Sequence, residues 1–527
     1  MNKPTQVIIV GGGPVGVALA VELGQRGISC VLLERRQRLQ NIPKGQNLTQ
    51  RTLEHFHSWG IADELRAARV MPAGYPIGTL TAYGSFASPY WHAPPGREQV
   101  RDYYFQDNDR LPQYCTEAVL RRKVATLPTV QDRMGWTATS VEQDKDGVRV
   151  AVSEEGGAGR DVLTADYVVG CDGARSMVRE QIGIKQSGQD FEQLMMLAVF
   201  RSRELHDKLS RFPDRSTYRV MNPALKGYWQ FLGRIDVGEG WFFHSPVPND
   251  AQQDSFDAHG FLETMAGFPF KAEFDYVGFW DMRIAVAGQY QVGRAFIAGD
   301  AAHSHPPYGG YGLNNGLEDA RNLGWKLAAK LQGWGGDKLL ASYSEERSRI
   351  FRETADDFIA KQIDVEAAFM DRYSPERSLT EFEKAWENFD DAISSKVSSY
   401  EPNYEGSPVV LGPPGGVSSA HGEHMIKARA GHHLTPRALS SGRNVFEELG
   451  PGFTLLAFGV DDAAVTGFEE AAKAIKAPLK IVRDDFAGER KGYEARMILV
   501  RPDQYVVWIG DAAPADARAL LTQVTGR

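Results

Sequence analysis

Cysteine is scarce in this chain of 527 residues, which contains only Cys30, Cys115 and Cys171. The three lie far apart and form no Cys-x-x-Cys pair, so we expect neither a disulfide framework nor a cysteine-ligated zinc site. No other metal site is indicated. An odd, small number of free cysteines fits a reducing compartment, and we therefore predict a cytoplasmic protein.

Long apolar runs are also missing, because none reaches the roughly 18 residues that a membrane helix requires. The apolar segment after Lys3 is interrupted by the glycines at 11–13 and by Pro14, and Glu22 follows soon after. These interruptions argue against a signal peptide. The sequence therefore predicts a protein with no membrane span.

An excess of basic residues is absent, since the formal net charge is -9 at pH 7. Nucleic-acid-binding proteins normally present a basic face, so that class is not expected. The apolar fraction of 42% and the charged fraction of 24% are those of a soluble globular protein. A chain of this length exceeds what one core usually holds, which predicts two or three domains.

A glycine-rich turn stands between an expected strand at 6–10 and an expected helix at 14–26. In this GxGxxG pattern Gly11 permits the tight turn, Gly13 lets the backbone approach a pyrophosphate, and Gly16 allows close helix-strand packing. The free amides and the positive end of the helix then hold the phosphates. The turn reads Gly11-Gly12-Gly13-Pro14-Val15-Gly16.

A second expected strand, at 28–33, ends next to Glu34, about 23 residues after Gly11. A carboxylate at this place binds the hydroxyls of an adenosine ribose. A plain glycine-rich turn is the alternative, but the first strand, the helix, the second strand and the acid occur in the order and spacing of a dinucleotide-binding unit. We therefore predict dinucleotide binding, which at this point does not separate NAD from FAD.

Two later motifs favour FAD. One follows an expected strand at 161–169 and contains Asp172; the other, GRAFIAGD, ends at Asp300. An acid at the end of a buried strand can hydrogen-bond the ribityl hydroxyls of a flavin. Glycines at 309–312, followed by a helix from about Leu313, offer backbone amides beside a developing flavin anion.

The three motifs, in this order and spacing, resemble the group A FAD-dependent aromatic hydroxylases, typified by p-hydroxybenzoate hydroxylase and phenol hydroxylase. The DG motif of that family matches Asp172 and Gly173, and its GD motif matches Gly299 and Asp300. Where the family usually has arginine this chain has Lys44, which preserves a phosphate contact with less planar geometry. The resemblance covers roughly the first two-thirds of the chain.

Two further matches concern the flavin ring. Gln113 is similar to the family's glutamine that touches FAD, and Pro306 with Pro307 matches the proline pair beside the isoalloxazine. The resemblance implies FAD contacts from Gly11, Gly13, Pro14, Val15, Gly16, Glu34, Arg35, Lys44, Gln113, Asp172, Gly299, Asp300, Pro307, Gly312, Leu313 and Asn314.

Aromatic residues crowd the alternating segment from about 194 to 280, where Trp229 and Phe231 are candidate substrate contacts. Alternation allows only one face to line a pocket, and a plain hydrophobic core is the alternative for each residue. Pro306 and Asn47 are further candidates, although Asn47 could equally stabilise a turn.

Two histidines, His303 and His305, follow the GD motif. Each could relay protons or merely satisfy backbone groups. The sequence therefore identifies no catalytic acid or base.

These patterns predict an α/β protein with three parts: a Rossmann-type FAD-binding domain, an inserted, mostly antiparallel β-sheet substrate domain, and a C-terminal α/β domain. The C-terminal part resembles the thioredoxin-like domain of the phenol hydroxylase branch but has no cysteine, so a structural or dimer-contact role is expected. Its last helix is predicted from Pro514 to Val524. The predicted boundaries are 1–74, 101–180 and 283–395 for the FAD-binding domain, 75–100 and 181–282 for the sheet domain, 396–431 for a linker, and 432–527 for the thioredoxin-like domain.

The resemblance implies a monooxygenase that hydroxylates a phenolic or other electron-rich aromatic compound. NADPH or NADH would reduce the FAD, O2 would add to it, and the resulting flavin hydroperoxide would deliver one oxygen atom. Two alternatives stay open, a flavin dehydrogenase or reductase on the same fold and a catalytically silent FAD-binding protein. The expected partners are a small aromatic substrate and O2, without nucleic acid or membrane, and a homodimer is compatible with the pattern.

Overall fold

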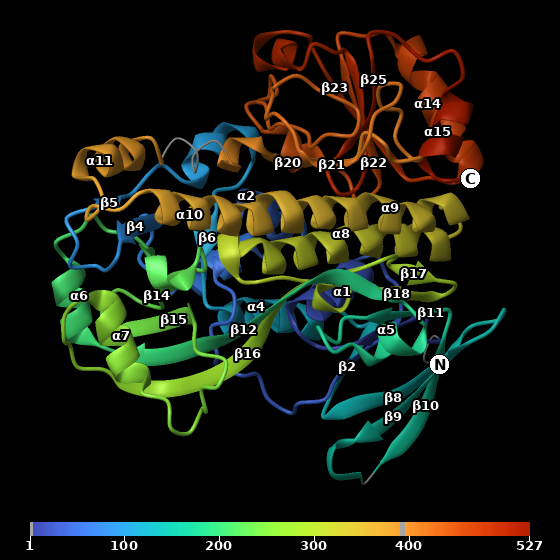
Figure 1. The fold of residues 1–527 in the computed structure, drawn as a ribbon. Coiled ribbons are helices and arrows are strands. Elements are labelled where there is room, and N and C mark those ends of the chain that lie inside the picture. The colour runs from blue at the N-terminus through green and yellow to red at the C-terminus, as the bar shows by residue number, and fades with distance from the viewer. Residues whose placement is uncertain (1–3, 158, 390–395) are drawn as a thin grey trace.

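The computed structural model describes residues 4–157, 159–389 and 396–527 (Figure 1). Its first sheet is parallel apart from one edge strand and has the order β17-β18-β11-β1-β2-β7. Every residue of the central strand β1 is buried, as an all-apolar run between two neighbouring strands requires. The strands are β1 (Val7–Val10), β2 (Cys30–Glu34), β7 (Val130–Met134), β11 (Tyr167–Gly170), β17 (Gln291–Val292) and β18 (Ala295–Ile297).

Helix α1 (Pro14–Gln25) connects β1 to β2 and packs against α4 (Gln113–Ala125) and α8 (Tyr311–Leu331). Proline begins α1, where its missing N–H costs no hydrogen bond. The other elements near this sheet are β3 (Asn47–Leu48), α2 (Gln50–Ser58), α3 (Ala62–Ala67), β6 (Asp109–Arg110) and α5 (Met177–Gln181).

A buried carboxylate, Glu22, joins α1 to its neighbours. It accepts hydrogen bonds from the Trp59 indole at 2.6 Å and from Arg26 at 2.7 Å, and it forms an ion pair with Arg321. Burial alone would raise the pKa of Glu22, but the two arginines outweigh it and lower the pKa from 4.5 to about 2. The ionised form of Glu22 therefore stabilises the folded state.

This shift predicts how stability depends on acid. A carboxyl group whose pKa is lower in the folded state stabilises fully above pH 4.5, and this stabilisation disappears as the pH falls towards 2. We expect Glu22→Gln to lose roughly 3 kcal/mol of unfolding free energy at pH 7 and to show a flatter decline below pH 5. Urea unfolding at a series of pH values measures this, with the exposed Glu470→Gln as control. Parallel pH curves for wild type and Glu22→Gln would contradict it.

An eight-stranded sheet forms the second part, in the order β19-β16-β12-β15-β14-β13-β4-β5. Its neighbours are antiparallel except β13 and β4. Helices α6 (Arg203–Leu209) and α7 (Ala258–Ala266) share a hydrophobic core with one face of it. The strands are β4 (Thr79–Tyr83), β5 (Trp91–His92), β12 (Gln186–Arg201), β13 (Thr217–Met221), β14 (Gln230–Arg234), β15 (Gly240–Pro246), β16 (Glu273–Ala287) and β19 (His303–Ser304).

The single strand predicted at 161–169 is wrong, because the chain changes sheet at Asp166. Its N–H bonds to the Gln6 carbonyl at 3.1 Å, which starts β11 beside β1. The residues before it form β10 (Arg160–Ala165) of a separate antiparallel sheet with β9 and β8, which projects from the domain (Figure 1). The alternation of apolar residues in the sequence does not show where the chain leaves one sheet and joins another. The other two strands are β8 (Trp136–Gln143) and β9 (Val148–Glu154).

The C-terminal unit has a four-stranded sheet in the order β23-β22-β24-β25, with β22 and β23 parallel and the other pairs antiparallel. This βαβββα arrangement is thioredoxin-like. The last helix begins at Ala517, not at Pro514 as predicted, because the Asp516 side chain caps it by accepting from the Ala519 N–H at 2.8 Å. The elements are β22 (Phe453–Phe458), α14 (Asp462–Ile475), β23 (Leu479–Asp484), β24 (Met497–Val500), β25 (Val506–Gly510) and α15 (Ala517–Val524).

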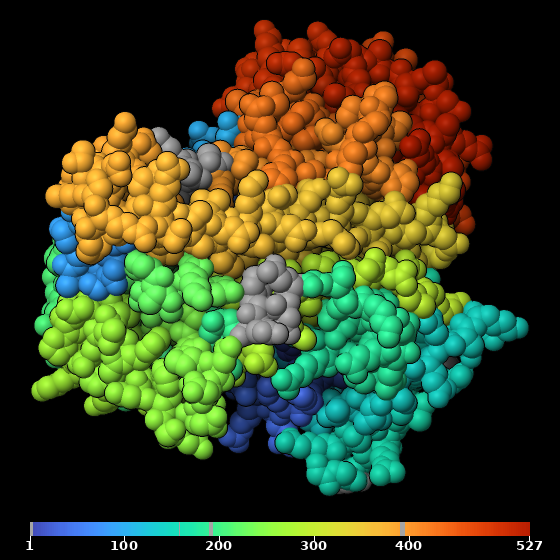
Figure 2. Space-filling model, in the orientation of Figure 1, coloured from blue at the N-terminus to red at the C-terminus, as the bar shows by residue number. Residues whose placement is uncertain are grey.

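Long helices separate the C-terminal unit from the rest of the molecule. Helices α8 and α9 (Asp337–Glu353) lie beneath that unit, and α10 (Lys361–Arg372) continues their layer to the left (Figure 1). The C-terminal unit forms a distinct lobe in Figure 2. Among the described residues no helix is both long enough and apolar enough to cross a membrane. The remaining elements are α11 (Leu379–Glu387), β20 (Tyr400–Asn403), β21 (Ser419–His421) and α13 (Val445–Glu448).

Candidate functional site

A cavity of about 590 Å³ lies between the parallel sheet, the eight-stranded sheet and the N-terminus of α8. Residues from all three glycine-rich motifs reach it, although they are far apart in the sequence. The predicted site residues that line it are Gly13, Pro14, Val15, Lys44, Asn47, Gln113, Trp229, Phe231, Asp300, Pro307, Gly312 and Leu313.

The turn before α1 has no room for side chains at two of its glycines. A Cβ atom on Gly11, which has φ +108°, would lie 2.3 Å from the Cys171 carbonyl oxygen, and one on Gly16 would lie 1.9 Å from the Gly11 carbonyl oxygen. Gly13 differs, since a Cβ there would meet no protein atom within 4 Å. No side chain caps the helix, so its first amides open towards the cavity. The turn therefore presents bare backbone to a ligand.

Glu34 adjoins this turn without lining the cavity. Its carboxylate accepts from the Gly12 N–H at 2.9 Å, and Arg121 donates to the Gly12 carbonyl at 2.6 Å while pairing with Asp132 at 2.7 Å. Arg35, the next residue, is exposed. Glu34 is thus held beside the glycines, whereas Arg35 has no comparable contact.

The two motif aspartates occupy different positions. Asp172 is outside the cavity lining and accepts from the Ser176 hydroxyl and the Val178 N–H, which fixes the start of α5. Asp300 lines the cavity and is open to it, while the surrounding protein raises its pKa against the opposing effects of His303 and Lys44. Gly299 is packed against Val15, since a Cβ would lie 2.9 Å from a Val15 methyl carbon. Asp300 is therefore the motif aspartate that faces the cavity directly.

The N-terminus of α8 is a second uncapped helix start. Gly310 precedes the helix with φ +69°, and no side chain accepts from its first amides. Asn314 instead clamps the neighbouring loop, donating to the carbonyls of Asn47 at 2.9 Å and Gly310 at 2.7 Å and accepting from the Thr49 N–H at 3.0 Å. The Asn314 side chain is thus engaged with protein groups, while Gly312 and Leu313 line the cavity.

Strand β15 divides its aromatic residues between two environments. Phe242 and His244 line the cavity, whereas Trp241 and Phe243 belong to the core under α6 and α7. The imidazole of His244 stacks on Phe231, with ring centroids 4.9 Å apart. Burial lowers the pKa of His244 to about 3, so the ring is neutral near pH 7. The cavity therefore has an uncharged aromatic wall.

The two histidines after the GD motif have separate roles. His303 is buried outside the cavity lining, where it pairs with Asp319 at 2.6 Å and stacks on Phe351. His305 lines the cavity, and burial lowers its pKa to about 4. Its Nδ1 contacts the carbonyl of Pro306, which is itself outside the lining. Within the described ranges no group of three or more His, Cys, Asp or Glu side chains could hold a metal ion.

Several lining residues were missed by the sequence reasoning. A charged side chain inside the alternating apolar strand TYRVM was a readable signal for Arg219. Gln46 lies between the predicted residues Lys44 and Asn47, and His244 lies in the aromatic segment at 194–280, so both stood in segments already singled out. Arg110, Glu366 and Lys396 gave no signal, because they reach the cavity only through contacts with distant segments. The missed residues include Gln46, Arg110, Arg219, His244, Glu366 and Lys396.

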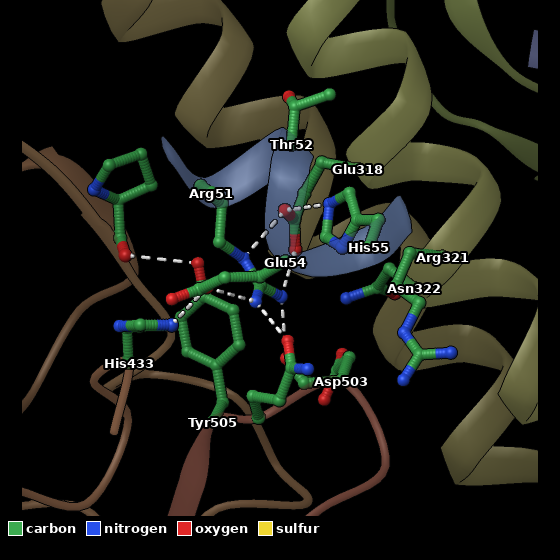
Figure 3. A network of polar contacts seen from close by, with 12 residues as sticks. Arg51, Thr52, Glu54, His55, Glu318, Arg321, Asn322, His433, Asp503 and Tyr505 are labelled. Carbon is green, nitrogen blue, oxygen red and sulfur yellow. Dashed lines mark hydrogen bonds and ion pairs between the residues drawn. The ribbon is translucent and has the colours of Figure 1, made fainter. Parts of the chain in front are cut away.

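A polar network behind the cavity joins α2 to α8 (Figure 3). Arg51 pairs with Glu318 at 3.0 Å and with Glu54 at 3.1 Å, and His55 pairs with Glu318 at 2.8 Å. Thr52 donates to Asn314 at 2.7 Å. The network thereby supports the loop that Asn314 clamps.

The same network extends into the C-terminal unit (Figure 3). His433 pairs with Glu54 at 2.7 Å, Arg51 donates to the Asp503 carbonyl at 2.5 Å, and the Arg51 guanidinium lies 5.3 Å from the Tyr505 ring centroid. The C-terminal unit therefore holds α2 through Arg51 and Glu54.

Comparisons with known proteins agree with this geometry. Residues 4–357 match the family model described as FAD binding domain, and residues 427–527 match the one described as aromatic-ring hydroxylase, C-terminal. An FAD-dependent monooxygenase (apdD) of Emericella nidulans is 29% identical, with 99% of this chain and 90% of that protein covered. Rifampicin monooxygenase of Streptomyces venezuelae is 28% identical, covering 98% and 97%. The rebeccamycin biosynthetic enzyme RebC with reduced flavin has a similar solved structure, at 27% identity, TM-score 0.82 and 100% coverage of both chains.

Proposed function

The chain belongs to the family of FAD-dependent aromatic-ring hydroxylases, and on this basis we propose that its cavity holds FAD at the motif end and the substrate against the eight-stranded sheet. It is an FAD-dependent monooxygenase of the kind that uses NAD(P)H and acts on aromatic or polyketide compounds. The observation that carries the proposal is one cavity joining two uncapped helix N-termini to an aromatic wall.

The residues present fit FAD by their chemistry. The amides at the start of α1 and the Lys44 ammonium would hold the diphosphate, and Glu34 the adenosine ribose. Asp300, open to the cavity, would accept from the ribityl hydroxyls, while the amides at Gly312 and Leu313 would face the flavin ring. Asp172 would act on the cofactor through the backbone that it holds in place.

Bound FAD supplies the transfer of electrons from NAD(P)H to O2 and the activation of oxygen. The chain's contribution is to orient the aromatic ring and to exclude water. Phe231, Phe242 and the neutral His244 ring offer flat, uncharged surfaces for this. The amides at the N-terminus of α8 would stabilise negative charge on the flavin ring.

A monooxygenase must place one atom of O2 in its product. We expect simple phenols, hydroxybenzoates, catechols or larger polycyclic phenols to stimulate NAD(P)H oxidation by the purified holoenzyme. With ¹⁸O2, mass spectrometry of the active substrate's product should show one labelled oxygen. Turnover without O2 on an artificial electron acceptor, giving an unlabelled product, would favour the dehydrogenase alternative instead. Failure of bound flavin to be reduced by NAD(P)H would favour a silent FAD-binding protein.

A homodimer and a cytoplasmic location also stay predictions from the sequence. Light scattering after gel filtration tests the first.

A further inference from the structure

Arg110, in β6, is a buried cation that lines the cavity and is 3% exposed. Its Nη1 donates to Asn47 Oδ1 at 2.6 Å and to Thr217 Oγ1 at 3.2 Å, and its Nη2 reaches the Arg234 carbonyl at 3.4 Å. Its Nε has no hydrogen-bond partner among the described residues. Every acceptor it contacts is neutral. A buried charge without a counter-charge is costly, so this site favours an anionic ligand.

Two cations on the same cavity, Arg219 and Lys396, differ from Arg110 in this respect. Arg219 pairs with Glu366 at 2.6 Å, and Lys396 donates to Gln362 close to the same carboxylate. The guanidinium of Arg219 also lies over the Trp229 ring, 4.4 Å from its centroid. Both cations therefore have the Glu366 carboxylate close by, whereas Arg110 contacts no carboxylate in the described part of the chain.

The position of Arg110 relative to the aromatic wall indicates what the anion is attached to. Its guanidinium lies 5.6 Å from the ring centroid of Phe242, which contacts both Phe231 and His244. Gly233 leaves room for this arrangement, because an added Cβ would lie 1.9 Å from the Phe242 ring and 2.7 Å from Arg110 Nη2. A planar ring against the wall would thus place a substituent beside the guanidinium. His244, being neutral, adds no charge of its own.

We propose that Arg110 is a specificity-determining residue that binds an ionised oxygen substituent, a carboxylate or a phenolate, of an aromatic substrate. The inference rests on the proposed function, since it assigns the class of compound that the same cavity takes. Charge-assisted hydrogen bonds from a guanidinium to an anionic oxygen are about twice as strong as neutral ones.

The test compares matched anionic and neutral probes on the holoenzyme by isothermal titration calorimetry. The carboxylate pair is 2-naphthoate and 2-naphthamide, and the phenolate pair is 4-nitrophenolate and 4-nitroanisole at pH 8. We expect wild type to bind the anion of at least one pair about tenfold more tightly or better. In Arg110→Met this preference should fall to about onefold, and Arg110→Lys should recover part of it. The pair that shows the preference identifies the group.

Lys396→Met is the matched control, because it removes a like charge from the same cavity and should keep the preference. An equal loss of anion preference in Lys396→Met and Arg110→Met would show that the cavity's overall positive potential, not a contact with Arg110, attracts the anion, and would overturn the proposal. A wild type that shows no anion preference would also overturn it. The melting temperature of Arg110→Met without ligand should stay unchanged or rise, since an uncompensated buried charge is removed. Flavin absorbance is recorded in parallel. A colourless wild type refutes FAD binding, whereas a wild type that retains flavin but shows no anion preference refutes only the role of Arg110.

Discussion

Gly16→Ala is expected to weaken FAD binding by about 10- to 100-fold and to destabilise the first domain. The new methyl group would lie 1.9 Å from the Gly11 carbonyl oxygen and 3.3 Å from Cys171 Cβ. The Gly11 backbone has no space to retreat, because it already abuts the Cys171 carbonyl. The turn must therefore open, which moves the amides that approach the cofactor. Equilibrium dialysis of FAD against the purified apoprotein measures the effect.

Gly13→Ala is the matched control for this prediction. A Cβ at that position meets no protein atom within 4 Å, and the backbone has φ -72°, which alanine adopts freely. The apoprotein should therefore keep the wild-type melting temperature, while the methyl group intrudes on the space of the cofactor and reduces its affinity. Stoichiometric flavin in Gly16→Ala would refute close contact between this turn and FAD.

Glu346→Gln is expected to cost about 3–5 kcal/mol of unfolding free energy. The carboxylate is fully buried and accepts two hydrogen bonds of 2.8 Å from Arg501, with a third of 2.7 Å from Lys326. Burial alone would raise the pKa of Glu346, but Arg501 and Lys326 outweigh it and hold the pKa well below its usual range. An amide in this place leaves the buried Lys326 without its counter-charge and Arg501 with Asp503 alone.

Urea unfolding followed by tryptophan fluorescence measures the loss. The control is Glu345→Gln, which changes the same charge one residue earlier on the exposed side of α9 and should cost no more than about 0.5 kcal/mol. Similar midpoints for the two variants would show that the ion pairs contribute little beyond packing.

The family and the fold class are predicted from the sequence and confirmed, because the signals that carry them are local. Gly11, Gly13 and Gly16 lie within six consecutive residues, and Asp300 follows three residues after the short buried strand β18. Arg110 could not be identified in this way. It reaches the cavity because β6 pairs with β3, although the two segments are more than sixty positions apart. No repeating pattern of residues in the sequence indicates this contact.

The prediction of the FAD-contacting residues was also limited, because some side chains can bond to protein groups instead of the cofactor. Asp172 and Asn314 stand at the expected positions, yet the structure commits the Asp172 carboxylate to α5 and the Asn314 amide to the loop around Asn47. Their proposed contacts with FAD therefore stay predictions. A sequence motif identifies the position but not which of several neighbours its side chain bonds.

The contacts between the C-terminal unit and the helices beneath it constrain how homologous genes could be recombined. Arg501 forms an ion pair with Glu346, and His433 forms one with Glu54. In each pair the two residues lie in parts of the chain that match different family models. A chimera that exchanges the final hundred residues would inherit one member of each pair from each parent. A stable chimeric hydroxylase therefore requires that both members of each ion pair come from the same parent.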